Sequence, residues 1–293
     1  MPPQDYREAM SDDHNSRTPK DSHYARLRRA HRDRAQQKPG KHALPAGPGT
    51  GDGIVRLYGL HTVRAALDNP KRRIKRLCIT RNAATRLELA DAEALSFPVE
   101  TVEPREIDRL LGPDAVHQGA LLEAEPLKPA PLRDLDGAAL VLVLDQVTDP
   151  HNVGAIMRSA VAFGVNALVT TARHSPAESG VLAKAASGAL EHIDHLTVRN
   201  LAEALEELAQ AGFQTIGLDS DGPKRLESTF EADRIALVLG AEGKGLRQKT
   251  RETVSALARL DVPGAIRSLN VSNAAAVSLY AACLHLKTIS DTE

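Results

Sequence analysis

The sequence has little cysteine, few aromatic residues and no long apolar run. Cys78 and Cys283 lie far apart and fit no CxxC or Cys/His spacing, so neither a disulfide framework nor a zinc or other metal site is expected. No apolar run approaches the roughly 18–20 residues that cross a bilayer, and the N-terminus has no apolar signal-peptide core. With 42% apolar and 26% charged residues, the composition predicts a globular protein of the reducing cytoplasm, with no membrane partner.

Charge is unevenly distributed although the net charge is only −1. Residues 1–50 hold ten Lys/Arg against six Asp/Glu, and the basic residues concentrate in "RLRRAHRDR" at 26–34. This stretch and the Pro/Gly-rich residues after it predict a disordered basic arm over 1–53. Such an arm can add non-specific phosphate affinity, but a solvated tail with no binding role explains the composition equally well.

Two folded regions follow the arm. Short strand and helix patterns alternate over 54–125, which predicts a small α/β domain. The stretch "PLKPAPLRDLDG" at 126–137 has three prolines in its first six residues and is typical of an inter-domain linker. A second domain is expected over 138–293.

This second region alternates apolar strand patterns with helical patterns. The expected strands are 139–145, 166–170, 193–198, 213–218, 235–240 and 256–261. The expected helices are 152–163, 177–190, 200–211, 246–255 and 270–287. This alternation predicts an α/β fold with a mostly parallel sheet covered on both faces, and a ligand site at the carboxyl ends of the strands.

The first strand-to-helix junction, "DPHNVGAIMRSA", contains a buried helix face. Val153, Ile156, Met157, Ala160 and Val161 recur at helical spacing on one side. Asn152 suits the helix cap, and Gly154 suits a close backbone approach. Arg158 falls outside the stripe, and by itself a solvated or ion-paired arginine is the plainer explanation.

The second junction is "IALVLGAEGKGLRQKT" at 235–250. A buried strand runs into Gly240, Gly243 and Gly245, with Glu242 between them, and such a loop can wrap backbone groups around a polar ligand. The loop lacks the spacing of a P-loop or of a dinucleotide-binding motif, so alone it is weak evidence.

The third junction is "LDVPGAIRSLNVSNAAAVSLYAACLHL" at 260–286. Ser268 and Asn270 are plausible helix caps. Five alanines at 274–276 and 281–282 make the following helix slim and suited to close packing, although ordinary helix propensity also explains them.

Taken in order and spacing, the three stretches resemble the signature motifs of the SpoU (TrmH) family of RNA ribose 2′-O-methyltransferases. The matching segments are "DPHNVGAIMRSAVAFGV", "LVLGAEGKGL" and "VPGAIRSLNVSNAAAVSLY". Further upstream, "LYGLHTVRAAL" and "AVHQGALLEAEPL" resemble the start and end of the ribosomal-protein-like substrate domain of the bacterial 23S rRNA guanosine methyltransferases in this family. Three ordered motifs over some 130 residues are far more specific than any one of them.

The resemblance implies a fold, a cofactor and an assembly that periodicity alone does not predict. It implies a trefoil-knot methyltransferase domain, a rare exception to unknotted topology, which binds S-adenosylmethionine and acts on RNA as a homodimer. It also implies the site residues. The cofactor contacts carried over are Gly240, Val262, Leu269, Gly243 and Gly245, and the polar active-site residues are Asn152, Arg158, Glu242, Ser268 and Asn270.

Arg158 is a poor candidate for a general base because a guanidinium ordinarily stays protonated. We expect Arg158 to hold the RNA phosphate beside the target ribose, and either that phosphate or an arginine with a lowered pKa to accept the 2′-hydroxyl proton. Glu242 is expected to orient Asn152 or Arg158. Lys184 is a further possible RNA contact, with an ordinary surface lysine equally compatible.

Two other functions fit parts of this pattern. A tRNA ribose methyltransferase would share the same motifs, and an RNA-binding or ribosome-assembly factor would share the fold without catalysis. The upstream domain favours 23S rRNA, and retention of the polar residues of all three motifs favours an enzyme.

Overall fold

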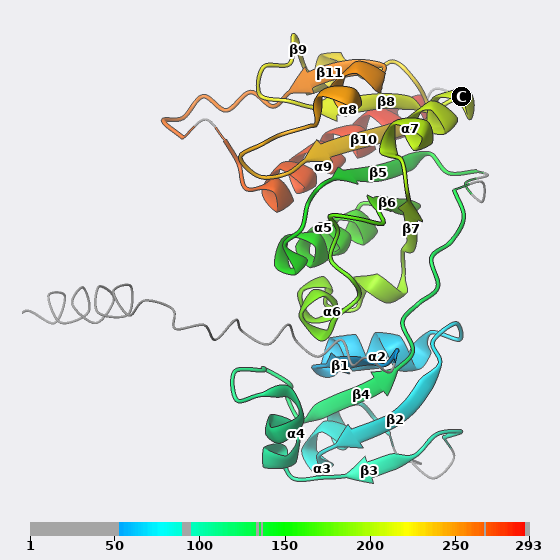
Figure 1. Ribbon diagram of the computed structural model, residues 1–293, viewed down its shortest axis with the longest axis vertical. Helices are drawn as coiled ribbons and strands as arrows, with labels where there is room; N and C mark the ends of the chain where they lie inside the picture. Colours follow the sequence, from blue (N-terminus) through cyan, green and yellow to red (C-terminus); the bar gives the residue numbers. More distant parts are fainter. Residues whose placement is uncertain (1–52, 90–94, 133–134, 136, 267, 291–293) are drawn as a thin grey trace, which may run out of the picture. The chain divides into compact units, whose positions relative to one another are not determined.

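The described residues of the computed structural model are 53–89, 95–132, 135, 137–266 and 268–290, and all belong to one unit, Ala46–Glu293. The predicted basic arm therefore lies outside the described residues, except for Gly53. Two sheets are present, and we call residues 54–125 the N-terminal lobe and residues 138–290 the C-terminal lobe (Figure 1).

The C-terminal lobe is built on a seven-stranded sheet in the order β7-β6-β5-β10-β8-β11-β9. Every strand pair in it is parallel, which confirms the α/β class and the parallel sheet. The strands are β5 (Leu140–Asp145), β6 (Ala167–Thr171), β7 (Asp194–Val198), β8 (Gln214–Leu218), β9 (Lys224–Arg225), β10 (Ile235–Gly240) and β11 (Ala256–Arg259). Six of these correspond to predicted strands, whereas the two-residue β9 is too short to leave a pattern.

Side chains of successive strand residues enter separate cores on the two faces of this sheet, because alternate residues of a strand point in opposite directions. On β5, Leu140, Leu142 and Leu144 belong to one core, and Val141 and Val143 belong to the other. The first core also holds α5 (Pro150–Ala162), α6 (Gly180–Ala186) and α9 (Val271–Ser290), and the second holds α7 (Leu201–Gln210) (Figure 1). The short helix α8 (Gln248–Thr253) lies in the connection between β10 and β11.

The N-terminal lobe has a four-stranded mixed sheet in the order β1-β4-β2-β3. Strand β4 is antiparallel to β1 and β2, whereas β2 and β3 are parallel. The elements are β1 (Val55–Tyr58), α2 (Leu60–Asp68), β2 (Ile74–Ile79), α3 (Arg81–Arg86), β3 (Val99–Thr101), α4 (Pro104–Leu111) and β4 (Ala120–Ala124). Many of its apolar residues join the first core of the C-terminal lobe, and α2 packs against α6 of that lobe.

Two local expectations are wrong. The helix expected over 177–190 breaks at Ser187 and Gly188, whose backbones are left-handed with φ of 52° and 97°, and a short 3-10 turn, η2 (Ala189–Glu191), follows. Asn152 is not the cap of α5, because that helix begins two residues earlier. Asp149 caps it by accepting from the His151 N–H at 2.9 Å, and Pro150 takes the first turn, where its missing N–H costs nothing.

Among the described helices, none combines the length and apolar character required to span a membrane.

Candidate active site

The carboxyl ends of β5 and β10 lie side by side, with Asp145 opposite Gly240. The Asp145 carboxylate is fully buried and accepts from the Arg247 backbone N–H at 3.0 Å, from Arg247 Nε at 2.6 Å and from Thr250 Oγ1 at 2.7 Å. A buried charge is tolerated only with such partners. This carboxylate therefore fixes the far end of the glycine-rich loop to the neighbouring strand.

The glycine-rich loop after β10 folds back on itself. The Gly245 N–H donates to the Ala241 carbonyl at 2.8 Å, and Gly243 and Gly245 both have positive φ. A Cβ on Gly240 would lie 2.1 Å from the Gly245 carbonyl carbon, so only glycine fits there. The loop thus presents backbone, with little side chain, to the space in front of it.

This space is a cavity of about 610 Å³ at the ends of β8, β10 and β11, which we call the loop cavity. The structure brings eight predicted site residues to its wall, and these come from the second and third motifs. They are Gly240, Glu242, Gly243, Gly245, Val262, Ser268, Leu269 and Asn270. The ion pair of Asp219 and Arg251 also lines the cavity and was not predicted, and the other polar residues there are Ser220, Asp221 and Lys244.

Asn270 joins the third motif to the first. Its Oδ1 accepts from the Ser272 N–H at 2.8 Å, which confirms that it caps α9, and its Nδ2 donates to Asn152 Oδ1 at 3.1 Å. Asn152 lines an adjoining cavity of about 330 Å³ that it shares with Glu242 and His174. The two asparagines therefore stand where the two cavities meet.

Glu242 is exposed at the rim of both cavities. Within the described part of the chain, no hydrogen bond or ion pair joins it to Asn152 or Arg158. The structure thus offers Asn270, and not Glu242, as the group that orients Asn152.

Arg158 lines neither of these cavities. It is exposed on α5 and lines a separate cavity with α2 residues of the N-terminal lobe. The buried stripe beside it is confirmed, since Val153, Ile156 and Met157 are fully buried, and a Cβ on Gly154 would lie 2.6 Å from the Leu182 carbonyl oxygen. The single chain thus keeps Arg158 apart from the other polar motif residues.

Lys184 is held between the lobes. Its Nζ donates to Gln118 Oε1 at 2.9 Å, and that same oxygen accepts from the Leu60 N–H at 3.2 Å. Burial lowers the pKa of Lys184. This lysine is more than an ordinary surface residue, although its contact is with Gln118 and not with a carboxylate.

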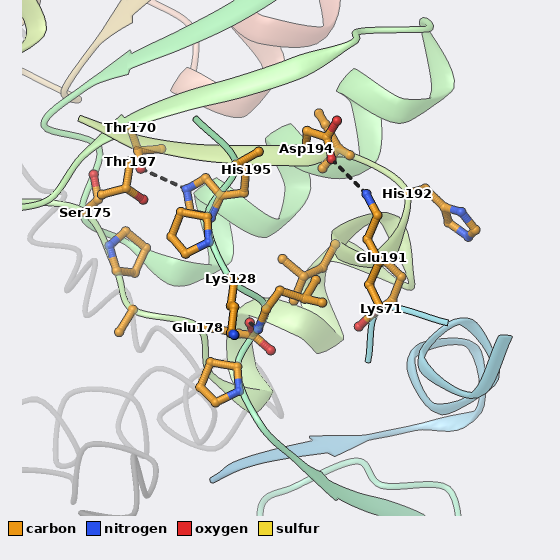
Figure 2. A pocket seen from close by; sticks show the side chains of 18 of the residues that line it. Lys71, Lys128, Thr170, Ser175, Glu178, Glu191, His192, Asp194, His195 and Thr197 are labelled. Carbon is orange, nitrogen blue, oxygen red and sulfur yellow. Dashed lines mark hydrogen bonds and ion pairs between the residues drawn. The ribbon is translucent and has the colours of Figure 1, made fainter. Parts of the chain in front are cut away.

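A further cavity, of about 520 Å³, lies where the linker passes β7 and contains none of the predicted residues (Figure 2). The Ala130 backbone pairs with Leu196, and His195 Nε2 lies 2.8 Å from Thr170 Oγ1. Burial lowers the pKa of His195 and raises the pKa of Glu178, which also lines this cavity. In the residues that the structure describes, no His, Cys, Asp and Glu side chains gather as a metal-ligand set.

Asp145 is the main functional residue that sequence reasoning missed. Its signal was a lone acidic residue ending the apolar run "ALVLVLD". A buried strand that ends in a carboxylate predicts a partner for the charge, but the sequence does not reveal which of the distant arginines supplies it.

Comparison with known proteins covers both lobes. Residues 139–280 match the SpoU rRNA Methylase family, and residues 56–130 match the family described as RNA 2′-O ribose methyltransferase substrate binding. The chain is 36% identical over 239 residues to the 23S rRNA (guanosine-2′-O-)-methyltransferase RlmB of Pseudomonas putida, a match spanning 78% of this chain and 96% of that protein. Its identity to the RlmB of Ralstonia nicotianae is 38% over 234 residues, which span 77% and 94% of the two chains.

Solved structures agree on the fold. The SpoU methyltransferase AviRb from Streptomyces viridochromogenes has a TM-score of 0.67 at 20% identity, over 80% of this chain and 91% of that one. The AdoMet-bound rRNA methyltransferase from Sinorhizobium meliloti has a TM-score of 0.66 at 23% identity, over 80% and 88%. At these identities the likeness is evidence for the fold.

Proposed function

Because this chain belongs to the SpoU rRNA methylase family, we propose that it methylates the ribose 2′-oxygen of a guanosine in 23S rRNA with S-adenosylmethionine as methyl donor. The observation that carries the proposal is the meeting of all three motifs at one edge of the sheet, where Asn270 contacts Asn152 beside the loop cavity. The reaction would take place in the cytoplasm, with the ribosomal RNA.

The residues of the loop cavity fit S-adenosylmethionine. Its volume of about 610 Å³ falls in the range of cofactor pockets, and Gly240 lets the loop fold back against the end of β10, where any Cβ would overlap the Gly245 backbone. Val262 and Leu269 supply apolar and backbone surface, and Gly243 and Gly245 line the cavity with backbone alone. When bound, the cofactor supplies a methyl group made electrophilic by its sulfonium.

The polar residues beside this cavity would hold the ribose. Asn152, oriented by Asn270, and Ser268 offer an amide and a hydroxyl that can hydrogen-bond a 2′-hydroxyl and keep its oxygen in line with the methyl group. No general base such as a free histidine is required there if the RNA phosphate takes the proton. Arg158 would hold that phosphate, because a guanidinium binds phosphate oxygens through two parallel N–H donors.

We also propose that the protein is a homodimer through α9. Val277, Tyr280 and Leu284 lie at i, i+3 and i+7 on this helix and are about half exposed, at 48%, 55% and 49%. Three large apolar side chains in a row on one helix face are typical of a surface that another chain covers. Tyr280 also packs on Phe163, directly after α5, so the surface adjoins the helix that carries Arg158.

The family implies a trefoil knot, which remains a prediction about the path of the chain from β10 to α9. Among the described residues, Ala275 and Ala282 are fully buried along α9, as close packing of a threaded helix requires.

Transfer of labelled methyl groups to defined RNAs tests the function. Purified protein with labelled S-adenosylmethionine should methylate a 23S rRNA transcript and leave bulk tRNA unlabelled, and primer extension at low dNTP should map one ribose. Labelling of tRNA alone would show that the protein is a tRNA ribose methyltransferase and not an rRNA methyltransferase. Absence of saturable S-adenosylmethionine binding would reduce the protein to an RNA-binding or assembly factor.

A further inference from the structure

A cavity of about 360 Å³ lies between α2 of the N-terminal lobe and the C-terminal half of α5. Its polar side chains come from both lobes, and we call it the α2–α5 groove. They are His61, Arg64 and Asp68 from α2, Arg158 from α5, and Ser187 and His192 from either side of η2. Asn152 and the residues of the loop cavity do not line it.

The walls of the groove are held together by hydrogen bonds. Thr62 Oγ1 on α2 donates to the Ala183 carbonyl at 3.2 Å, and Asn69 Nδ2 donates to Glu191 Oε2 at 2.7 Å. At the floor, a Cβ on Gly188 would lie 3.0 Å from the Ala65 Cβ, so glycine allows α2 to approach the turn before η2. Hydrogen bonds and close packing between α2 and the segment from α6 to η2 therefore hold the groove in shape.

A buried ion cluster just beyond α2 strengthens this junction. The Arg72 side chain is fully buried and binds Glu191 through both Nε and the terminal nitrogen Nη2, while its other nitrogen, Nη1, lies 2.6 Å from Glu178. The Leu127 N–H donates to the second oxygen of Glu178 at 2.8 Å, which ties in the linker. A buried arginine whose three guanidinium nitrogens are all hydrogen-bonded fixes the relative position of the elements that it joins.

The groove carries more positive than negative groups. Asp68 is its one carboxylate, and it lies 3.5 Å from Arg64, an exposed and therefore weak pair. Arg158 has no hydrogen bond or ion pair within the described parts of the chain, and the imidazoles of His61 and His192 are exposed donors. Two guanidiniums and two imidazoles around one carboxylate favour an anionic ligand.

From this arrangement we infer that the α2–α5 groove binds a phosphodiester segment of the RNA substrate, with His61 and Arg64 as positioning residues shared with Arg158. The inference rests on the proposed function, which supplies the RNA. Guanidinium forks match phosphate oxygens, and phosphate contacts set the register of a nucleic acid on a protein. The RNA-binding lobe would thus act on the same RNA segment as the helix that carries the catalytic motif.

The groove lies within reach of the proposed reaction centre. Arg158 follows Asn152 by six residues on α5, which corresponds to about 9 Å along the helix axis. Because both residues belong to one rigid helix, an RNA phosphate held by Arg64 and Arg158 has a fixed distance to the ribose held at Asn152. This relation makes His61 and Arg64 determinants of which nucleotide enters the site.

The paired variant His61→Ala/Arg64→Gln tests the inference by RNA binding, measured as fluorescence anisotropy of a labelled 23S rRNA fragment against salt concentration. The expected result is an RNA Kd raised about tenfold, with a salt slope smaller by about one for each lost phosphate contact. The Kd for S-adenosylmethionine should stay unchanged, because neither residue lines the loop cavity. Equal RNA affinity and equal salt slope in variant and wild type would overturn the inference.

Asp68→Asn provides a change in the opposite direction that does not depend on loss of function. Removing the one carboxylate of the groove should tighten RNA binding about twofold to threefold. Arg225→Gln is the matched control, because Arg225 is an exposed, ion-paired arginine on β9, outside the groove. Weaker or unchanged binding by Asp68→Asn, or an equal loss in Arg225→Gln, would contradict a specific phosphate site.

These readouts separate the two proposals. If wild type binds the RNA fragment but transfers no methyl group, the proposed function fails while the groove is still tested by its binding constants. If methyl transfer is normal and the groove variants bind RNA as wild type does, only the groove inference fails. Binding of inorganic phosphate by the wild type that the groove variants lose and that RNA does not displace would identify a free-phosphate site and overturn the RNA assignment.

Discussion

The side-chain amide of Asn270 donates to the side-chain oxygen of Asn152 at 3.1 Å across 118 residues of sequence. The bond links the cap of α9 to the first turn of α5, directly beside the loop cavity. Each asparagine therefore orients the other. Because the Asn152 oxygen accepts this bond, the amide nitrogen of Asn152 can face a ligand.

Asn152→Ala should lower kcat for methyl transfer by about a hundredfold, because it removes a positioned hydrogen-bonding group and leaves Asn270 without its partner. The Kd for S-adenosylmethionine, measured by calorimetry, should change little, since the loop cavity is lined by other residues. His151→Ala is the control, an exposed neighbour on the same helix turn. Equal turnover in both variants would remove Asn152 from the reaction.

Gly240→Ala should abolish cofactor binding and destabilise the fold by at least about 2 kcal/mol, because the new Cβ would overlap the Gly245 backbone, which cannot rotate away as a side chain can. Urea unfolding and equilibrium S-adenosylmethionine binding measure the two effects. Gly264→Ala adds the same methyl group where nothing lies within 4 Å, and it should be nearly neutral in stability. Retained cofactor affinity in Gly240→Ala would place the cofactor elsewhere.

Asp145→Asn should cost about 2 kcal/mol of unfolding free energy, since the buried carboxylate accepts from the Arg247 backbone and side chain and from Thr250. The amide keeps the shape but offers one acceptor in place of two. Loss of this anchor should also weaken cofactor binding through the glycine-rich loop. Asp233→Asn changes an exposed acid just before β10 that does not line the loop cavity, and it should change neither quantity.

Stability should depend on pH through Glu178, because burial raises the pKa of its carboxyl above the ordinary 4.5 in spite of Arg72 at 2.6 Å. A carboxyl with a raised pKa in the folded chain contributes stability below about 4.5 and loses that contribution as pH rises through the folded pKa. The unfolding free energy of Glu178→Gln relative to wild type should therefore increase as pH rises above about 4.5. Urea unfolding at several pH values measures it.

Glu123→Gln is the control of opposite sign for this experiment. Hydrogen bonds from Arg76 and Arg56 lower the pKa of Glu123, so its contribution is present above about pH 4.5 and is lost as pH falls through the folded pKa. Its variant should lose its disadvantage below about pH 4.5. A flat difference for Glu178→Gln across the upper range would show that its carboxyl is ionised throughout.

Val277→Lys/Leu284→Lys should convert the proposed dimer to a monomer in size-exclusion chromatography with light scattering. The reason is that two apolar side chains that the dimer would bury become charged. Glu203→Lys, which adds the same lysine to an exposed position of α7 on the opposite face of the sheet, should leave the mass unchanged. A wild-type chain that is monomeric at micromolar concentration would remove the dimer from the proposal.

Much of the site was accessible from the sequence because its residues follow strands that periodicity identifies. The apolar run 235–240 is β10 as predicted, and the glycines after it form the loop that the pattern indicated. The expected positions of two side chains, Asn152 and Arg158, could not be predicted from periodicity. Asn152 lies inside α5, since Asp149 and Pro150 compete better for the helix start, and Arg158 lies in the α2–α5 groove, away from the loop cavity.

The sequence by itself determined most strands and helices of this protein, because burial of one face imposes a period of two on a strand and of 3.6 on a helix. It also determined the family, through three ordered motifs. Which elements become neighbours was decided only by the tertiary structure. Strand β10 lies between β5 and β8, and this order brings Asp145 to Arg247 and Asn152 to Asn270. Local patterns record which side of an element is buried, but they carry no information about the distant partner that buries it.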